Sequence, residues 1–232
     1  MILTLNEKIQ VEIQRKNVKR VNILIKWNGK VRITAPHNID ENTIKTILQK
    51  KSRWIEDKLE TLKEYVSAHP MPVNFSNNET IWLLGKPLIL QVREGKKEII
   101  RDDGKLIIQV EKVEKEKVRK VLIEYMRNLA EKIINLKAEE LSGITGIKPQ
   151  KIEIRDWKRK WGLCKISNQT LVFNWRSVQL PEELINYIIA HEIAHFKYIK
   201  HNKKFWNYLQ YIIPESQHHK EELKSWISTL LW

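Results

Sequence analysis

Apolar and polar residues alternate with a period of two over the first third of the chain, a pattern typical of half-buried β-strands. Three such runs follow one another, and an Asn-Gly pair at 28–29, between the second and the third, favours a tight hairpin turn. Asp40 then provides an N-cap for a segment whose apolar residues recur every three or four positions. We therefore expect an amphipathic helix from this cap to about Tyr65, followed by a connector over 67–78.

A second group of strands is predicted in the middle of the chain. Apolar runs at 81–84 and 88–90 flank a Gly-Lys-Pro turn, and an Asp-Gly pair at 103–104 indicates another hairpin. A long helical pattern then covers about 113–141, with one apolar face along its length. Gly143 is expected to end this helix, because glycine readily adopts the conformation found at helix C-termini.

The last third of the chain predicts short strands and helices. One strand is expected at 152–154 and another at 171–174, with a basic loop at 157–162 between them. Three helices should follow, beginning near Pro181, Asn202 and Glu215. Together these patterns predict an α+β fold. We divide it into a β-rich N-terminal region with one amphipathic helix (1–111) and a mostly helical region with a small sheet (112–232).

Composition narrows the class of protein. With 42% hydrophobic residues the chain can form a core. No apolar run approaches the length of a membrane span, and the first residues lack the pattern of a signal peptide. Cys164 is the single cysteine, which excludes a disulfide framework and favours a reducing, cytoplasmic location. We expect it to be a small buried apolar residue and not a nucleophile.

The net charge is +14, from 42 Lys and Arg against 28 Asp and Glu. Such a chain attracts polyanions, so a basic surface for nucleic acid or nucleotides is one interpretation. The competing interpretation is that the lysines lie on solvated helix faces, because charge alone does not define a site.

The segment His191-Glu192-Ile193-Ala194-His195 carries the strongest chemical signal in the chain. Two histidines four residues apart lie on one face of a helix, where neutral imidazoles can converge on one Zn²⁺. Glu192, beside the first histidine, is placed to act as a general base without binding the metal, as in metalloprotease motifs. A chance match of this short pattern is the alternative, and a third histidine nearby argues against it.

That third histidine, His201, follows His191 by ten residues. On one continuous helix this separation is about 15 Å, too far for two ligands of one ion. The spacing equals that of the metzincin pattern, but Tyr198 occupies the position of the glycine that makes the metzincin turn. Either the helix ends within 196–200 and the chain folds back, with Asn202 capping the next helix, or His201 is not a ligand.

Three blocks of sequence together resemble the YgjP-like metallopeptidase family, whose members are predicted metal-dependent hydrolases. The blocks are Trp161-Gly162-Leu163-Cys164, Leu171-Val172-Phe173-Asn174-Trp175-Arg176, and the histidine motif with His201-Asn202-Lys203-Lys204-Phe205-Trp206. The N-terminal half is similar less specifically, so the resemblance spans nearly the whole chain.

The resemblance implies a zincin-like catalytic half related to the SprT-like proteases. It implies that His191, His195 and His201 bind one zinc ion per chain and that Glu192 is the base. The family usually has serine where this chain has Leu163, so a polar contact from that loop is not carried over. Serine is also frequent at the position of Asn202, where asparagine still provides a helix cap.

Three further residues are candidates for substrate binding. Arg176 can bind an anionic group or stabilise developing charge, or it can pair with a structural carboxylate. Trp161 can stack on substrate, although core packing is the default for tryptophan. Tyr198 can donate a hydrogen bond to an oxyanion or point outward from its helix. His218 and His219 are expected at the surface.

The leading hypothesis is a zinc-dependent metallopeptidase that acts on a protein or peptide. One alternative is a metal-dependent nucleoside triphosphate pyrophosphatase acting on UTP, an activity attributed to the family. Against it, the chain lacks a phosphate-binding P-loop, and phosphoryl chemistry more often uses Mg²⁺ on carboxylates. The other alternative is a nucleic-acid-binding protein in which the metal is structural.

Overall fold

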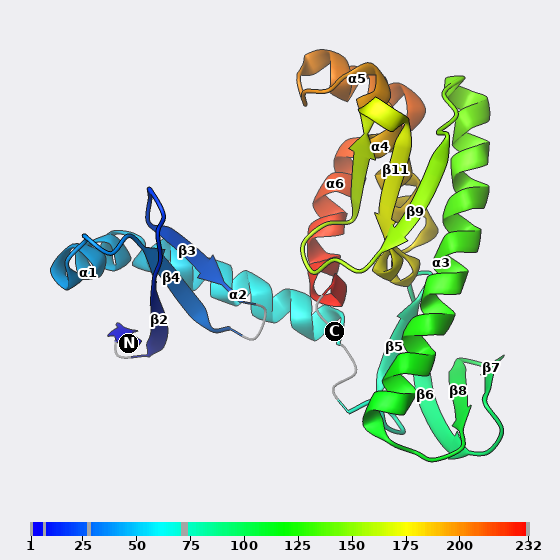
Figure 1. The fold of residues 1–232 in the computed structure, drawn as a ribbon, viewed down its shortest axis with the longest axis horizontal. Coiled ribbons are helices and arrows are strands. Elements are labelled where there is room, and N and C mark those ends of the chain that lie inside the picture. The colour runs from blue at the N-terminus through cyan, green and yellow to red at the C-terminus, as the bar shows by residue number, and fades with distance from the viewer. Residues whose placement is uncertain (1, 7, 27–28, 71–73, 231–232) are drawn as a thin grey trace. The chain divides into compact units, whose positions relative to one another are not determined.

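The computed structural model describes residues 2–6, 8–26, 29–70 and 74–230. Its contacts divide the chain into two compact units, Met1–Ala68 and His69–Trp232. Each unit combines strands with helices (Figure 1), which confirms the predicted α+β class. The predicted division at residue 111 follows a change in sequence character and stays a prediction, whereas by contact the chain divides after Ala68.

The first unit contains a four-stranded sheet. In spatial order its strands are β1 (Ile2–Leu5), β2 (Ile9–Arg15), β4 (Val31–Ala35) and β3 (Asn22–Ile25). The alternating pattern predicted these strands because Val11 and Ile33 are fully buried between polar neighbours. β3 and β4 pair antiparallel with Ile25 opposite Val31, as expected for a hairpin. The Asn-Gly pair predicted for its turn lies partly outside the described residues, which resume at Gly29.

Two helices, α1 (Glu41–Lys50) and α2 (Ser52–Ala68), stand where the sequence predicted one. Asp40 caps α1 as predicted, because its carboxylate accepts a hydrogen bond from the backbone N–H of Thr43 at 2.7 Å. The prediction of one continuous helix is wrong, since the helix breaks at Lys51. The break allows buried residues of both helices to join the same small core.

The second unit contains two sheets. The strands of the first, in spatial order, are β5 (Thr80–Leu83), β6 (Lys86–Glu94), β8 (Lys105–Val110) and β7 (Glu98–Asp102). Those of the second are β10 (Gly162–Lys165), β11 (Thr170–Asn174) and β9 (Lys151–Arg155). The helices are α3 (Lys115–Thr145), α4 (Glu182–Lys197), α5 (Lys203–Ile212) and α6 (Ser216–Ser225), with short 3₁₀ turns η1 (Ile166–Asn168), η2 (Trp175–Gln179) and η3 (Trp226–Leu230).

The long helix α3 joins the two sheets of this unit. It contacts β8 of the first sheet and β9 of the second, and it runs alongside both in Figure 1. Fully buried side chains from both sheets and from the helices form one continuous core, which includes Leu90, Leu122, Phe173 and Ile189. Among the described residues, every helix is too short or too polar to span a lipid bilayer.

The ends of these elements refine the sequence predictions. The Asp-Gly hairpin is confirmed, since Asp103 and Gly104 both have positive φ and join the antiparallel strands β7 and β8. Gly143 does not end α3. The helix continues for two more residues, and Gly146, with φ of 68°, ends it by donating a hydrogen bond to the carbonyl of Ser142. Strand β10 was not predicted, because it is a short edge strand next to a polar loop.

The turn between β5 and β6 fixes the start of α4. Backbone N–H groups of Leu84 and Gly85 donate hydrogen bonds to the carbonyls of Val178 and Gln179, at 2.8 and 3.0 Å. Gly85 has a φ of +74°, and a Cβ at this position would lie 2.8 Å from the Cγ of Pro181, the residue before α4. Only glycine therefore permits this close approach without strain.

Replacement of Gly85 by alanine is expected to lower the free energy of unfolding by about 2–4 kcal/mol, through left-handed strain together with overpacking. Gly104→Ala is the matched control, because Gly104 has a similar φ of +71° but nothing within 4 Å of the added Cβ. Its loss is expected to be about 1–2 kcal/mol, from strain alone. Denaturant unfolding of both variants measures the difference, and equal losses would contradict the proposed contact with Pro181.

Candidate metal centre

Helix α4 carries the histidine motif, and apolar packing surrounds it on most sides. It packs against α3, β10, α5 and α6. Its buried apolar residues include Leu184, Ile185, Ile188, Ile189 and Ile193. Glu182 and Glu183 in its first turn suit the positive end of the helix dipole. Such extensive packing holds the side chains that project from α4 in fixed positions.

The chain reverses direction directly after the motif. α4 ends at Lys197, where the backbone N–H of Tyr198 closes the last turn on the carbonyl of Ala194 at 2.9 Å. Asn202 then caps α5, its side-chain oxygen accepting a hydrogen bond from the N–H of Phe205 at 3.1 Å. The predicted end of the helix within 196–200 and the predicted cap are both confirmed.

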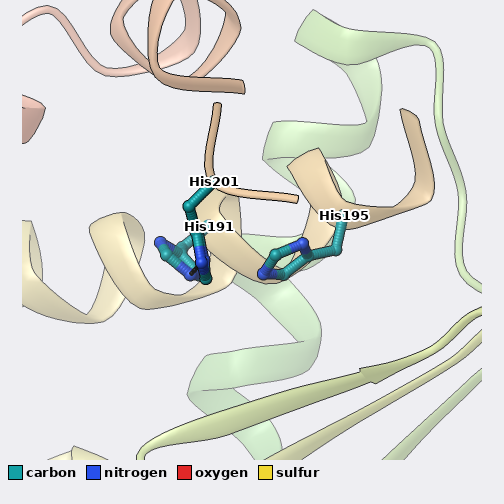
Figure 2. A group of neighbouring side chains, drawn as sticks. All are labelled: His191, His195 and His201. Atoms are coloured by element: carbon teal, nitrogen blue, oxygen red, sulfur yellow. Dashed lines mark hydrogen bonds between the residues drawn. The ribbon is translucent and has the colours of Figure 1, made fainter. Parts of the chain in front are cut away.

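This reversal brings His201 back to the two histidines of α4. The Nε2 atoms of His191 and His201 lie 2.9 Å apart, and one nitrogen of each ring in the triad lies within 4.8 Å of the others. Figure 2 shows the three rings gathered at one point. Two nitrogens bound to one tetrahedral zinc at 2.0–2.1 Å are separated by about 3.3 Å. The rings therefore need only small movements to share one ion.

A backbone carbonyl orients His195. Its Nδ1 lies 3.1 Å from the carbonyl oxygen of Tyr198, the residue that ends α4. A carbonyl can only accept, so Nδ1 carries the proton and Nε2 is left as the basic nitrogen. This is the outer contact that metal-binding histidines usually make, and it fixes both the tautomer and the direction of the ring.

His191 is the most enclosed member of the triad. Burial, reinforced by the charges of His195, His201 and Lys220, lowers the pKa of His191 to about 3. Burial also lowers the pKa of His201. Phe205 packs against all three rings at centroid distances of 4.7 to 5.0 Å. Burial thus favours the neutral forms of His191 and His201, and the neutral form of imidazole is the one that binds metals.

The donor set fits a divalent transition metal. Within the part of the chain that the structure describes, these three histidines are the group of His, Cys, Asp and Glu side chains close enough to share an ion. Imidazole nitrogens suit zinc and its neighbours, whereas Mg²⁺ and Ca²⁺ prefer oxygen ligands. Three protein ligands leave one tetrahedral position open, as in catalytic and not structural zinc sites.

Glu192 is a nearly buried carboxyl group next to this triad, with 8% of its surface exposed. Burial raises the pKa of Glu192 to about 7, against the opposing effects of a hydrogen bond from the Cys164 backbone and the charge of Lys160. Strand β10 approaches the carboxylate closely. A Cβ on Gly162 would lie 2.7 Å from both Oε1 and Cγ of Glu192, so only glycine leaves room for this side chain.

The triad and Glu192 line one open cavity of about 490 Å³. Its walls come from β10, the loop before it, η1, α4, the chain after α4, and α6. Trp161, a predicted substrate-binding residue, is part of the lining, as is half-buried Cys164. Burial and the nearby carboxylate of Glu192 raise the pKa of the Cys164 thiol to about 12, so it is no nucleophile at neutral pH.

The other two predicted substrate-binding residues are not among those that line this cavity. Arg176 is fully buried, where its guanidinium pairs with Asp156 and lies 4.2 Å from the centre of the Trp175 ring. This placement favours the structural alternative for Arg176. Tyr198 contributes its carbonyl to His195, while its ring packs against Tyr208 at a centroid distance of 5.7 Å.

Two positions differ from the sequence analysis. The prediction that His219 lies at the surface is wrong, because His219 is buried where α6 packs against α4. The centroids of the His219 and Tyr187 rings lie 6.3 Å apart. His218 is exposed as expected. Tyr187 also lines the cavity and was missed, although it precedes His191 by four residues and so shares its helix face.

Comparisons with known proteins identify relatives of the chain. The family model of the YgjP-like metallopeptidase domain matches residues 19–226. The uncharacterized protein MJ0123 of Methanocaldococcus jannaschii is 38% identical over 76 residues, which cover 32% of this chain and 69% of that protein.

Two crystal structures of metallopeptidase zymogens also match part of the chain. Abylysin of Pyrococcus abyssi is 23% identical over 39% of this chain and 90% of its own, with a TM-score of 0.36. Jannalysin of Methanocaldococcus jannaschii is 33% identical over 41% of this chain and 91% of its own, with a TM-score of 0.33.

The family match covers the histidine triad, Glu192 and the strand that contacts Glu192. It confirms the resemblance that the three sequence blocks indicated. It also implies a metal ion, for which the convergent imidazoles provide the donors. The chain belongs to the YgjP-like metallopeptidase family and is a metallohydrolase.

Proposed function

We propose that the protein is a zinc-dependent metallopeptidase in which His191, His195 and His201 bind one zinc ion and Glu192 is the general base. The observation that carries this proposal is the convergence of three imidazoles beside a nearly buried carboxyl group, in a cavity open to solvent. The family supports a peptide as the class of substrate.

Zinc, when bound, supplies a Lewis acid that polarises a carbonyl oxygen and lowers the pKa of water. Residues of the chain orient the ligands and transfer the proton. The carbonyl of Tyr198 holds His195 in one tautomer, and Phe205 packs the three rings in place. A carboxylate oxygen of Glu192 accepts a proton from water and then gives it to the leaving amide nitrogen. Its pKa of about 7 suits both transfers at neutral pH.

Gly162→Ala is expected to lower kcat/KM by about 10²-fold, the order of loss that a displacement of about 1 Å produces in a catalytic group. The reason is that the added Cβ occupies the space of the Glu192 carboxylate. Zinc stoichiometry, measured by mass spectrometry, is expected to stay at one ion per chain, because the three atoms nearest to the added Cβ all belong to Glu192 and none to a histidine. Gly143→Ala is the control, since nothing lies within 4 Å of its added Cβ. Full activity in Gly162→Ala would contradict the role given to Glu192.

The nucleotide alternative has weaker support from the cavity. Lys160 is the one Lys or Arg side chain among the described residues that line it, whereas a triphosphate carries several negative charges that cationic groups would stabilise. Most of the remaining lining is apolar.

A parallel assay on peptides and on UTP tests the proposed function. The zinc-loaded protein is expected to cleave unstructured protein or peptides and to leave UTP intact. A chelator should abolish the cleavage, and added zinc should restore it. Release of pyrophosphate from UTP without any cleavage of peptides would overturn the proposal and support the nucleotide hydrolase.

A further inference from the structure

One part of the cavity beside the triad is built from apolar side chains. They come from three stretches of the chain: β10 with η1, α4 with the segment that follows it, and α6. The residues are Leu163, Ile166, Ile188, Ile199 and Leu223, and we call this part of the cavity the apolar pocket. Because residues so distant in sequence converge there, the pocket is a product of the tertiary fold and not of one amphipathic helix.

Two members of the apolar pocket remain open to solvent. Ile166 is 41% exposed and Ile199 is 72% exposed. A single exposed isoleucine is ordinary on a protein surface. Two that border the same cavity, together with the half-buried Leu163 and the buried Ile188, form the kind of concave apolar surface that binds apolar ligand groups.

Two lysines bring positive charge to the cavity, and one acid outside the lining, Glu221, acts on the lining residue Tyr187. Lys160 lines the cavity, and its charge acts on the carboxyl group of Glu192. Lys220 acts on two members of the triad and lies 4.3 Å from the centre of the Trp206 ring. Among the described lining residues Glu192 is the single acid. A cationic ligand group would therefore meet the like charges of Lys160 and Lys220, and the described lining residues offer it no carboxylate besides the proposed base.

We propose that the apolar pocket is the specificity site of the enzyme and that it accepts a large aliphatic or aromatic side chain next to the scissile peptide bond. This inference rests on the proposed peptidase function, because the pocket shares its cavity with the triad and Glu192. The substrate class is thus a peptide segment with a residue such as leucine or phenylalanine at the cleavage site. A lysine at the same place is disfavoured.

The test uses internally quenched peptides with the zinc-loaded protein. The residue on each side of the scissile bond is varied in turn among Leu, Phe, Ala, Gly and Lys. At one of the two positions, kcat/KM is expected to rise by at least about tenfold from Gly to Leu or Phe and to be lowest for Lys. The Ile166→Ser/Ile199→Ser double variant is expected to lower the Leu-to-Gly ratio to less than about a third of its wild-type value.

The matched control is Leu136→Ser/Ile144→Ser on α3, which changes two exposed apolar residues, 60% and 57% accessible, that do not line the cavity. It should keep the wild-type ratio. Cleavage without any preference for apolar residues would overturn the specificity site, as would a preference that the pocket variant leaves unchanged. If no peptide is cleaved, the proposed function fails. Fluorescence anisotropy with labelled Leu and Gly peptides then tests the specificity site separately. Equal binding of the two peptides overturns the specificity site, and tighter binding of the Leu peptide supports it.

Discussion

Glu192→Gln is expected to lower kcat/KM for peptide cleavage by about 10³-fold, within the range of about 10²–10⁴ typical of a general base. Glutamine has nearly the same size and can keep the contact with Gly162, but its amide accepts no proton at neutral pH. A 10³-fold loss corresponds to about 4 kcal/mol of transition-state stabilisation. The zinc content is expected to remain at one ion per chain, because the group of described residues that could hold an ion consists of the three histidines and does not include Glu192.

Glu183→Gln is the matched control for this substitution. Glu183 lies in the first turn of the same helix and is exposed, so its replacement is expected to leave kcat/KM unchanged. Steady-state kinetics and metal analysis on the same preparations separate the two effects. A Glu192→Gln enzyme with wild-type activity would exclude Glu192 as the base, and one without zinc would place this residue among the ligands.

His201→Ala is expected to lower zinc affinity by about 10³-fold or more, because loss of a ligand exceeds the 10- to 100-fold loss typical of an outer-shell partner. Peptide cleavage at low micromolar zinc should fall with it. His201 is exposed and lies outside the helices, so the fold should survive the substitution and the melting temperature of the metal-free protein should be unchanged. Competition with a chromogenic zinc chelator measures the affinity directly.

His218→Ala is the control, since His218 is also an exposed histidine but lies on α6 outside the triad. Its zinc affinity should equal that of the wild type. If the wild type and both variants had equal zinc affinities, only two histidine ligands would remain. The reversal of the chain after α4 would then have no part in metal binding.

The features that local sequence predicts are those governed by helix and strand periods. The spacing of His191 and His195 places both on one face of α4 whatever the surrounding fold. The return of His201 toward the motif could also be inferred from the sequence. Its distance from the motif along the chain allows a shared ion only if the helix ends in between. The same periodicity places Tyr187 on the helix face of His191, one turn earlier. Its position near the site could therefore have been predicted, but no sequence motif marks it.

Other features depend on contacts between distant parts of the chain. The partner of Arg176 is Asp156, twenty residues away, and nothing in the local sequence distinguishes this pairing from an anion-binding role. Gly162 looks like an ordinary loop glycine until β10 is placed against Glu192. His219 is buried because α6 packs on α4, although the polar sequence around it suggests a surface position.

The exact ends of the helices also could not be predicted from the sequence. Gly143 and Gly146 are equally good glycines for a helix terminus, and the structure uses the second. The break at Lys51 has no proline or glycine to announce it. In both places the packing of the helix against its own core decides the end, a tertiary effect that local preference does not record.

X-ray absorption at the zinc K-edge, on the zinc-loaded protein beside His201→Ala, tests the central claim most directly. Three imidazole nitrogens at about 2.0–2.1 Å, with one oxygen ligand from water completing the tetrahedron, are the predicted first shell. The substitution should remove one imidazole from the fit. A wild-type shell with two imidazoles or fewer, or a spectrum that His201→Ala leaves unchanged, would contradict the three-histidine site.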